Sequence, residues 1–187
     1  MADPSFSLTV PEGDDIARKV CDTCGFVAYE NPKIVVGSVV RHDGRILLCR
    51  RAIEPRRGFW TIPAGYLELN ETPEDGARRE AREEARATLA IERLLAVYSV
   101  PRISQVQLIY RASLAEPGFA AGPESLDVRL FAEDEIPYDE LAFPSVHWAL
   151  GHDREVQAGA PPIPFSNPAG ETGSRMPSGE RLGVDRM

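Results

Sequence analysis

Two hydrophobic patterns divide the middle of the chain into predicted strands and helices. Short runs of β-branched and other apolar residues between turn residues are typical of strands. Five such runs occur: IVVGSVVR from Ile34, RILLCRR from Arg45, ERLLAVYSV from Glu92, QVQLIYRASL from Gln105 and LDVRLFA from Leu126. The sequence His42-Asp43-Gly44 separates the first two runs, and an Asp-Gly pair favours a hairpin turn. The pattern therefore predicts a sheet that begins with a hairpin.

A helix is predicted to begin at Pro73. Thr72 can cap it, proline suits the first helical position, and Glu74 and Asp75 favour the positive end of the helix dipole. Nothing breaks the helical pattern until about Arg86. This helix lies between the second and third predicted strands.

A second helix is predicted over residues 143–156. Pro144 lies near its start, and Val146 and Leu150 share an apolar side. Strands on both sides of one amphipathic helix, followed by a second helix, favour a layered α+β domain. We place this domain at residues 33–157.

The two ends of the chain lack these periodic patterns. We expect residues 1–20 to form an extended arm. This arm is the first part of an N-terminal segment over residues 1–32. From Pro161 onward the chain is rich in proline and glycine. We therefore expect residues 158–187 to be disordered.

Composition excludes several classes of protein. Of the 187 residues 43% are hydrophobic and 27% charged, as in globular proteins. There is no apolar run near 18 residues, so we expect no membrane-spanning helix, and the acidic N-terminus lacks the apolar core of a secretory signal. Three cysteines make no disulfide framework, which favours a reducing cytoplasm. The net charge of −8 argues against a nucleic-acid surface and suggests that cations accompany any anionic substrate.

Three carboxylates converge on one face of the first predicted helix. Residues three and four apart are neighbours on a helix, which places Glu80, Glu83 and Glu84 within one arc. Arg79 and Arg82 lie close but cannot neutralise all three charges. Mg²⁺ or Mn²⁺ ions can bind several carboxylates at once, because hard cations prefer oxygen ligands. For the cluster taken alone, the alternative is a solvated acidic face.

The spacing around the cluster is more specific. Gly65, Glu71 and the run Arg79-Glu80-x-x-Glu83-Glu84 together resemble the signature of the Nudix hydrolases, and the preceding W-x-x-P-A-G run from Trp60 resembles the strand that enters it. The resemblance implies an α/β/α sandwich with a mixed central sheet, the two helices lying on opposite sides. We refer to residues 65–87 as the box.

The box departs from the family pattern in two places. Ala81 stands where the family has a bulky apolar residue, and Arg86-Ala87 replaces glycine followed by an aliphatic residue. A glycine there acts as a left-handed helix cap, which another residue adopts at a cost of about 1 kcal/mol. Either the helix continues past Arg86, or its end is slightly strained.

The resemblance assigns roles to the box residues. It implies metal ligands from Glu80, Glu83, Glu84 and the backbone carbonyl of Ala64. Gly65, Glu71 and Arg79 would shape the box, with Arg79 pairing with a carboxylate, Glu71 among the candidates.

The sequence does not identify which residue takes the proton from the attacking water. Glu83, Glu84 and Glu124 are all eligible. Glu124 lies in the segment GPES, where the family often has a further glutamate, and Glu133 and Glu135 are its rivals.

Three residues near the box are candidates for substrate binding. Arg50 and Arg51 end a predicted strand and could contact phosphates, or they could be a solvated strand end. Trp60 could stack on a base, or it could pack in the core. The nearby Cys49 is expected to be a buried thiol.

The segment before the domain carries the knuckle Cys21-x-x-Cys24. With Tyr29-x-Asn31-Pro32-Lys33 it resembles the zinc ribbon that precedes some Nudix domains, but the first knuckle is missing. A structural zinc site needs four ligands. We therefore expect a ribbon remnant without zinc, the alternative being a site shared across a dimer.

The resemblance implies a function. Nudix domains with this ribbon are associated with ADP-ribose, NADH and FAD. The sequence therefore predicts a Mg²⁺- or Mn²⁺-dependent homodimeric enzyme that cleaves such a nucleotide and releases AMP plus a phosphorylated moiety. The alternatives are a house-cleaning hydrolase of nucleoside triphosphates and a non-catalytic Nudix-fold module that senses a nucleotide.

Overall fold

The computed structural model describes residues 5–182, and the chain divides into two units, Met1–Pro32 and Lys33–Met187. The first unit is a three-stranded antiparallel sheet of β1 (Phe6–Thr9), β2 (Arg18–Cys21) and β3 (Val27–Ala28), in that order. The expectation of an extended arm over residues 1–20 is therefore wrong for the described part. The strands are too short to show a periodic pattern in the sequence.

The second unit is built on a seven-stranded mixed sheet. Its strands are β4 (Lys33–His42), β5 (Arg45–Arg51), β6 (Trp60–Thr61), β7 (Ala64–Tyr66), β8 (Leu89–Val100), β9 (Gln105–Leu114) and β10 (Ser125–Phe131). The order is β10-β5-β4-β9-β8, with β6 paired to β5 and β7 to β4. β4 and β9 run parallel, and the other pairs are antiparallel. The predicted strands and the mixed sheet are confirmed.

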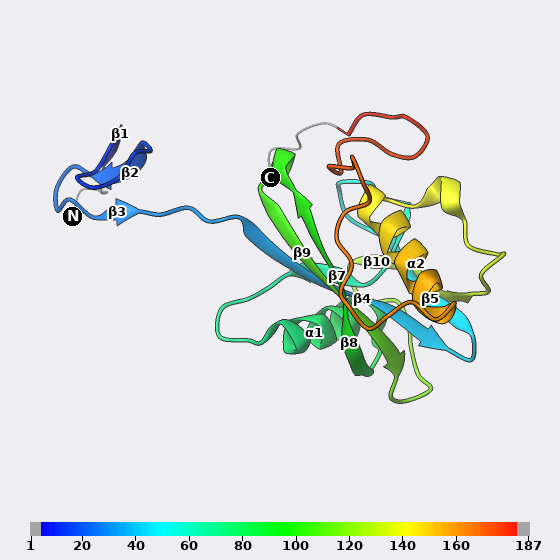
Figure 1. The fold of residues 1–187 in the computed structure, drawn as a ribbon. Coiled ribbons are helices and arrows are strands. Elements are labelled where there is room, and N and C mark those ends of the chain that lie inside the picture. The colour runs from blue at the N-terminus through cyan, green and yellow to red at the C-terminus, as the bar shows by residue number, and fades with distance from the viewer. Residues whose placement is uncertain (1–4, 183–187) are drawn as a thin grey trace. The chain divides into compact units, whose positions relative to one another are not determined.

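Two α-helices cover opposite faces of this sheet (Figure 1). Successive residues of a strand point to opposite faces. On β4, the buried Val40 packs with α1 (Pro73–Ala85), whereas the buried Val39 packs with α2 (Pro144–Gln157). Two 3₁₀ turns, η1 (Pro101–Ile103) and η2 (Tyr138–Glu140), complete the elements. The predicted α/β/α layering is confirmed.

The ends of α1 follow from the sequence. The hydroxyl of Thr72 accepts a hydrogen bond from the Asp75 N–H at 3.2 Å, and Pro73 takes the first position. At the other end Arg86 adopts the left-handed region with φ 51°, and its N–H bonds the carbonyls of Ala81 and Arg82. The sequence left two alternatives for the altered end of the box. In the structure the helix does not continue past Arg86, and this non-glycine residue forms the left-handed cap.

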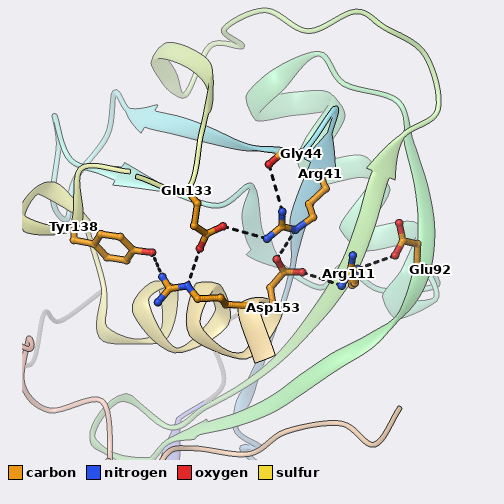
Figure 2. Close-up of polar contacts among 8 residues, drawn as sticks. Arg41, Gly44, Glu92, Arg111, Glu133, Tyr138 and Asp153 are labelled. Carbon is orange, nitrogen blue, oxygen red and sulfur yellow. Dashed lines mark hydrogen bonds and ion pairs between the residues drawn. The ribbon is translucent and has the colours of Figure 1, made fainter. Parts of the chain in front are cut away.

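A buried charge network ties α2 to the sheet (Figure 2). Asp153 of α2 is fully buried and accepts a hydrogen bond from Arg41 Nε of β4 at 2.6 Å, with Arg111 Nη1 of β9 at 3.5 Å. Glu133 accepts from Arg41 at 3.3 Å and from Arg154 at 2.8 Å. The network fixes α2 on the sheet, because separating the buried carboxylate of Asp153 from its cations would cost folding free energy.

The segment after α2 is ordered over residues 158–182, in contrast to the expected disorder. Phe165 exchanges backbone hydrogen bonds with Leu95 and Val97 at 2.9 Å each. The side chain of Asn167 bonds both backbone groups of Ser99 at 2.8 Å. The segment therefore covers the free edge of β8, and its glycines, such as Gly173 with φ 73°, allow the turns. Residues 183–187 of the expected disordered tail lie outside the described residues.

Among the described helices, none combines the length and apolar character that crossing a membrane requires.

Candidate active site

The box carboxylates line one cavity of about 420 Å³ in the second unit. α1 contributes Glu80, Glu83 and Glu84, and β7 contributes Ala64 and Gly65. The structure thus brings together, from two elements, the residues that the spacing of the box singled out.

Arg79 organises the carboxylates around it. Its Nε and Nη2 donate to the two oxygens of Glu71 at 3.1 and 2.8 Å, and Nη2 also donates to the Tyr66 carbonyl at 2.8 Å. Nη1 donates to Glu80 at 2.7 Å and to Glu83 at 3.0 Å. The two-pronged pair with Glu71 fixes the plane of the guanidinium, which then holds two cavity carboxylates.

Glu84 is the most deeply buried carboxylate of the cavity, with 5% of its surface exposed. Burial raises the pKa of Glu84 to about 8, and the neighbouring charges of Glu80 and Glu124 add to the rise. The Ala64 N–H donates a hydrogen bond to this carboxylate at 3.0 Å, and this bond lowers the pKa of Glu84. A buried carboxylate of this kind either keeps a proton near neutral pH or requires a cation.

Gly65 is required by the position of Glu80. A Cβ atom at residue 65 would lie 2.3 Å from Oε1 of Glu80, well inside contact distance. Glu80 itself is buried, and burial raises the pKa of this carboxyl, while its hydrogen bond to Arg79 lowers it. The absence of a side chain at residue 65 therefore makes the space in which the Glu80 carboxylate lies.

The loop that carries Glu124 is anchored on the C-terminal end of α1. The N–H groups of Ala120 and Gly122 donate to the carbonyls of Ala85 and Glu84 at 2.8 and 2.9 Å. A Cβ at residue 122 would lie 1.6 Å from the backbone oxygen of Glu83, so only glycine fits there. The loop satisfies carbonyls that a helix end leaves unpaired, and it places Glu124 in the cavity lining.

The two rivals of Glu124 lie elsewhere. Glu133 belongs to the charge network around Arg41 and Arg154 (Figure 2). Glu135 accepts a hydrogen bond from the Ala132 N–H at 3.0 Å. Neither lines the cavity, so Glu124 is the loop glutamate that meets the box.

The chemistry of this donor set fits a hard divalent cation. Glu80, Glu83, Glu84 and Glu124 supply carboxylate oxygens, and the buried Glu84 lacks a cationic partner within hydrogen-bond distance among the described residues. Across residues 5–182 no three acidic, histidine or cysteine side chains surround a common point, and Arg79 holds Glu80 and Glu83. A cation would thus share these oxygens with Arg79.

Of the three candidate substrate-binding residues, only Arg51 lines the cavity. It is half-buried, its Nε donates to the Pro55 carbonyl at 2.8 Å, and its guanidinium lies 5.2 Å from the ring centroid of Phe143. Arg51 is therefore a cation placed beside the carboxylates.

The other two candidates do not contact the cavity. Arg50 is exposed, and its Nε donates to the Gly58 carbonyl at 2.8 Å. Trp60 is 5% exposed and packs edge-on against Phe131 in the core, with ring centroids 4.9 Å apart. Because neighbouring strand residues point to opposite faces, Arg50 and Arg51 could not both face one site. Neither Arg50 nor Trp60 lines the cavity, and their role in substrate binding stays a prediction.

None of the three cysteines is among the residues that line the cavity. Cys49 is buried in the core, and burial raises the pKa of its thiol, as expected for an inert residue. In the first unit Cys21 is buried and Cys24 is exposed, and both are free. N–H groups of Cys24 and Thr23 lower the pKa of Cys21.

The structure also shows a polar row along the cavity that the sequence motifs do not indicate. Gln105, Gln107 and Tyr66 line it beyond the carboxylates, as do Phe143 and Pro144 at the start of α2. In the strand sequence QVQLIY, glutamine alternates with apolar residues, which indicates that both glutamines share one face. The sequence does not indicate which face of the strand lines the site.

Comparison with known proteins identifies both units. Residues 31–149 match the family model of the NUDIX domain, and residues 4–30 match the model described as Nudix N-terminal, a zinc-ribbon family. The crystal structure of a NUDIX hydrolase from Nitrosomonas europaea is 46% identical, with a TM-score of 0.81, over 86% of this chain and 92% of that one.

Curated relatives are less similar. A MutT-like protein from Streptomyces ambofaciens is 38% identical over 102 residues, which cover 54% of this chain and 64% of the relative. The ADP-ribose pyrophosphatase of Methanocaldococcus jannaschii is 29% identical over 119 residues, 62% of this chain and 69% of the relative. The matched part of the chain thus spans about two thirds of the length of these relatives.

Proposed function

The chain belongs to the Nudix hydrolase family, and on that premise we propose that it hydrolyses the diphosphate bond of a nucleoside diphosphate derivative. The observation that supports this most strongly is the convergence of Glu80, Glu83, Glu84 and Glu124 on one cavity, in which the guanidinium of Arg79 holds Glu80 and Glu83. An acidic cavity repels a diphosphate unless cations accompany it, so the same cluster implies a divalent cation, Mg²⁺ or Mn²⁺.

Each cavity residue has a proposed role. Glu80, Glu83, Glu84 and the Ala64 carbonyl would hold the cation, which when bound offsets the charge of the phosphate oxygens and activates water. Arg79 orients Glu80 and Glu83 through its pair with Glu71. Arg51 would bind a phosphate oxygen.

The proton of the attacking water needs an acceptor. Glu83, Glu84 and Glu124 all line the cavity and remain eligible. Glu84 differs from the other two because it is buried, and in the absence of a cation burial raises its pKa to about 8.

For the substrate we propose ADP-ribose or a dinucleotide such as FAD or NADH, with AMP and a phosphorylated moiety as products. Two observations support this class: the relative named ADP-ribose pyrophosphatase, and the extension of the cavity beyond the carboxylates to Gln105, Arg102 and Gly173. A substrate with a second group beyond its diphosphate would occupy that extension.

A second candidate is pyrophosphohydrolysis of nucleoside triphosphates, which the relative named MutT-like supports. A non-catalytic nucleotide sensor is a third, but the charged box residues that a degenerate module would lose are all present here. Incubation with Mg²⁺ and each substrate class, with products identified by mass, separates these candidates. AMP from ADP-ribose supports the proposal, monophosphate plus pyrophosphate from triphosphates supports the second, and calorimetric binding without turnover supports the third.

We further propose that the enzyme is cytoplasmic and a homodimer. Free cysteines in both units are consistent with a reducing compartment. Light scattering of the full chain tests the oligomeric state, and a mass near that of one chain, 20.6 kDa, would contradict it.

A further inference from the structure

A chain of neutral polar side chains runs along the cavity wall away from the carboxylates. Gln107 Nε2 donates to Oε1 of Gln105 at 3.3 Å, and Gln105 Nε2 donates to the Tyr66 hydroxyl at 3.3 Å. All three side chains line the cavity and are half-buried. We call these three residues the glutamine ladder.

Strand register places the ladder relative to the box. On β4, Gly37 pairs with Ala64 of β7 on one side and with Ile109 of β9 on the other. Two residues further out, Val35 pairs with Tyr66 and with Gln107. Because a strand rises about 3.3 Å per residue, the row of Tyr66 and Gln107 lies about 7 Å from the row of Ala64.

Gln105 continues in the same direction. It pairs with Lys33, two residues beyond Val35, so its row lies about 13 Å from that of Ala64. Gln105, Gln107 and Ile109 share one face of β9, since side chains alternate along a strand. The ladder therefore starts about 7 Å from the row of Ala64 and extends away from it.

The ladder has hydrogen-bonding capacity left for a ligand. An amide side chain has two N–H donors and a carbonyl acceptor. Within residues 5–182, the ladder uses one N–H of each glutamine and the carbonyl of Gln105. This leaves the second N–H of each amide and the carbonyl of Gln107, a mixture of donors and acceptors without charge.

The walls near the ladder are mainly apolar, and two cations lie beside it: Arg102 lines the same cavity, and Lys33 Nζ lies 5.2 Å from the ring centroid of Tyr66. Val35, Val100, Ile103, Phe143 and Val146 line the same cavity. Polar groups in an apolar cavity fix the orientation of a ligand, because a ligand that fails to pair with them leaves them unsatisfied. The neutral amides, unlike the flanking cations Lys33 and Arg102, can both donate hydrogen bonds to vicinal hydroxyls and accept hydrogen bonds from them.

We propose that the glutamine ladder is a specificity-determining subsite that binds the hydroxyl groups of a ribosyl ring next to the diphosphate. The proposal rests on the proposed function, since it places the diphosphate at the box. The ring can belong to the nucleoside or to the group on the other side of the diphosphate, and these share the same chemistry.

The test is calorimetric binding in full-length protein that carries Glu83→Gln, so that Mg²⁺ can be present with little turnover. The probes are ADP-ribose and the methyl ester of ADP, which keeps the diphosphate and lacks the second ribose. Gln107→Leu and Gln105→Leu are compared with Val106→Thr, a control on the opposite face of the same strand.

Each glutamine change is expected to weaken ADP-ribose binding by about threefold to tenfold per lost hydrogen bond, with the control unchanged. Weaker binding of ADP-ribose alone assigns the ladder to the second ribose. Weaker binding of both probes assigns it to the nucleoside ribose. Equal affinity of the Gln107→Leu protein and its parent, or no ADP-ribose binding at all, overturns the proposal. Release of AMP by protein with Glu83 intact is measured separately, so absent turnover with intact binding counts against the proposed function alone.

Discussion

Glu80 lies directly against Gly65, so that a Cβ atom at residue 65 would come within 2.3 Å of the Glu80 carboxylate oxygen. The glycine of the box and its first clustered carboxylate, fifteen positions later in the sequence, are thus one steric unit. The glycine keeps this space open for the carboxylate, and it needs no left-handed backbone to do so.

Gly65→Ala is expected to displace the Glu80 carboxylate while the fold survives, because the displaced atoms are the end of a flexible side chain. Divalent-cation affinity should fall about 10- to 100-fold, as for other disturbed ligand positions. Calorimetric titration with Mg²⁺ measures this. Gly118→Ala is the matched control, since nothing lies within 4 Å of a Cβ there. Unchanged affinity in Gly65→Ala would contradict the steric account.

Arg79→Lys is expected to reduce turnover about 10- to 100-fold, because an ammonium cannot form the two-pronged contact with Glu71 and also hold Glu80 and Glu83. Glu71→Gln should have a similar effect, and the double variant should be little worse than either one. Steady-state rates of the three proteins give this comparison. Arg78→Lys, at the exposed pair with Asp75, should have no effect. Additive losses would mean that Arg79 and Glu71 act separately.

Arg86→Gly is expected to stabilise the protein by about 0.5 kcal/mol, since glycine adopts the left-handed region without strain but loses more backbone entropy on folding. Urea denaturation gives the free energy of unfolding. Arg82→Gly, in the last turn of the same helix, should instead destabilise by up to about 1 kcal/mol. A loss of stability in Arg86→Gly would show that the arginine side chain itself holds the box end.

The folded protein should lose stability in mild acid because of His152. This side chain is buried, its Nδ1 lies 2.7 Å from the Tyr98 hydroxyl, and burial lowers its pKa. Above the unfolded pKa of about 6.5 both states are neutral and the stability is complete. As pH falls below that value, the unfolded state gains the proton first, so stability declines until the lower folded pKa is reached.

His152→Asn should therefore flatten the dependence of unfolding free energy on pH between about 6.5 and the folded pKa. Part of the slope should remain, because burial also lowers the pKa of His147. His42→Gln, at the C-terminal end of β4, serves as the control. An unaltered slope in His152→Asn would mean that acid acts on other groups.

Local patterns were sufficient for most of the fold. The apolar run in RILLCRR and the alternation in QVQLIYRASL predicted strands that the structure reproduces as β5 and β9, and Thr72-Pro73 marked the start of α1. The proximity of Glu80, Glu83 and Glu84 was predictable from their spacing, because helix geometry alone determines which residues share a face.

What the sequence could not predict depends on distant partners. Trp60 is buried because Phe131, seventy-one positions later, packs against it. Residues 158–182 are ordered because β8 leaves an edge that Phe165 and Asn167 can bond. Neither the tryptophan nor the proline-rich segment carries a local signal of these contacts.

The measurement that tests the central claim most directly is the hydrolysis of ADP-ribose with Mg²⁺ by the unaltered protein and by Glu83→Gln, with AMP as the measured product. Glu83 is exposed, so its replacement should leave the fold intact. The proposed function predicts AMP release by the unaltered protein, its loss on chelation, and a fall of several orders of magnitude in the variant. Near-equal rates for the two proteins would contradict the assignment of the box as the catalytic centre.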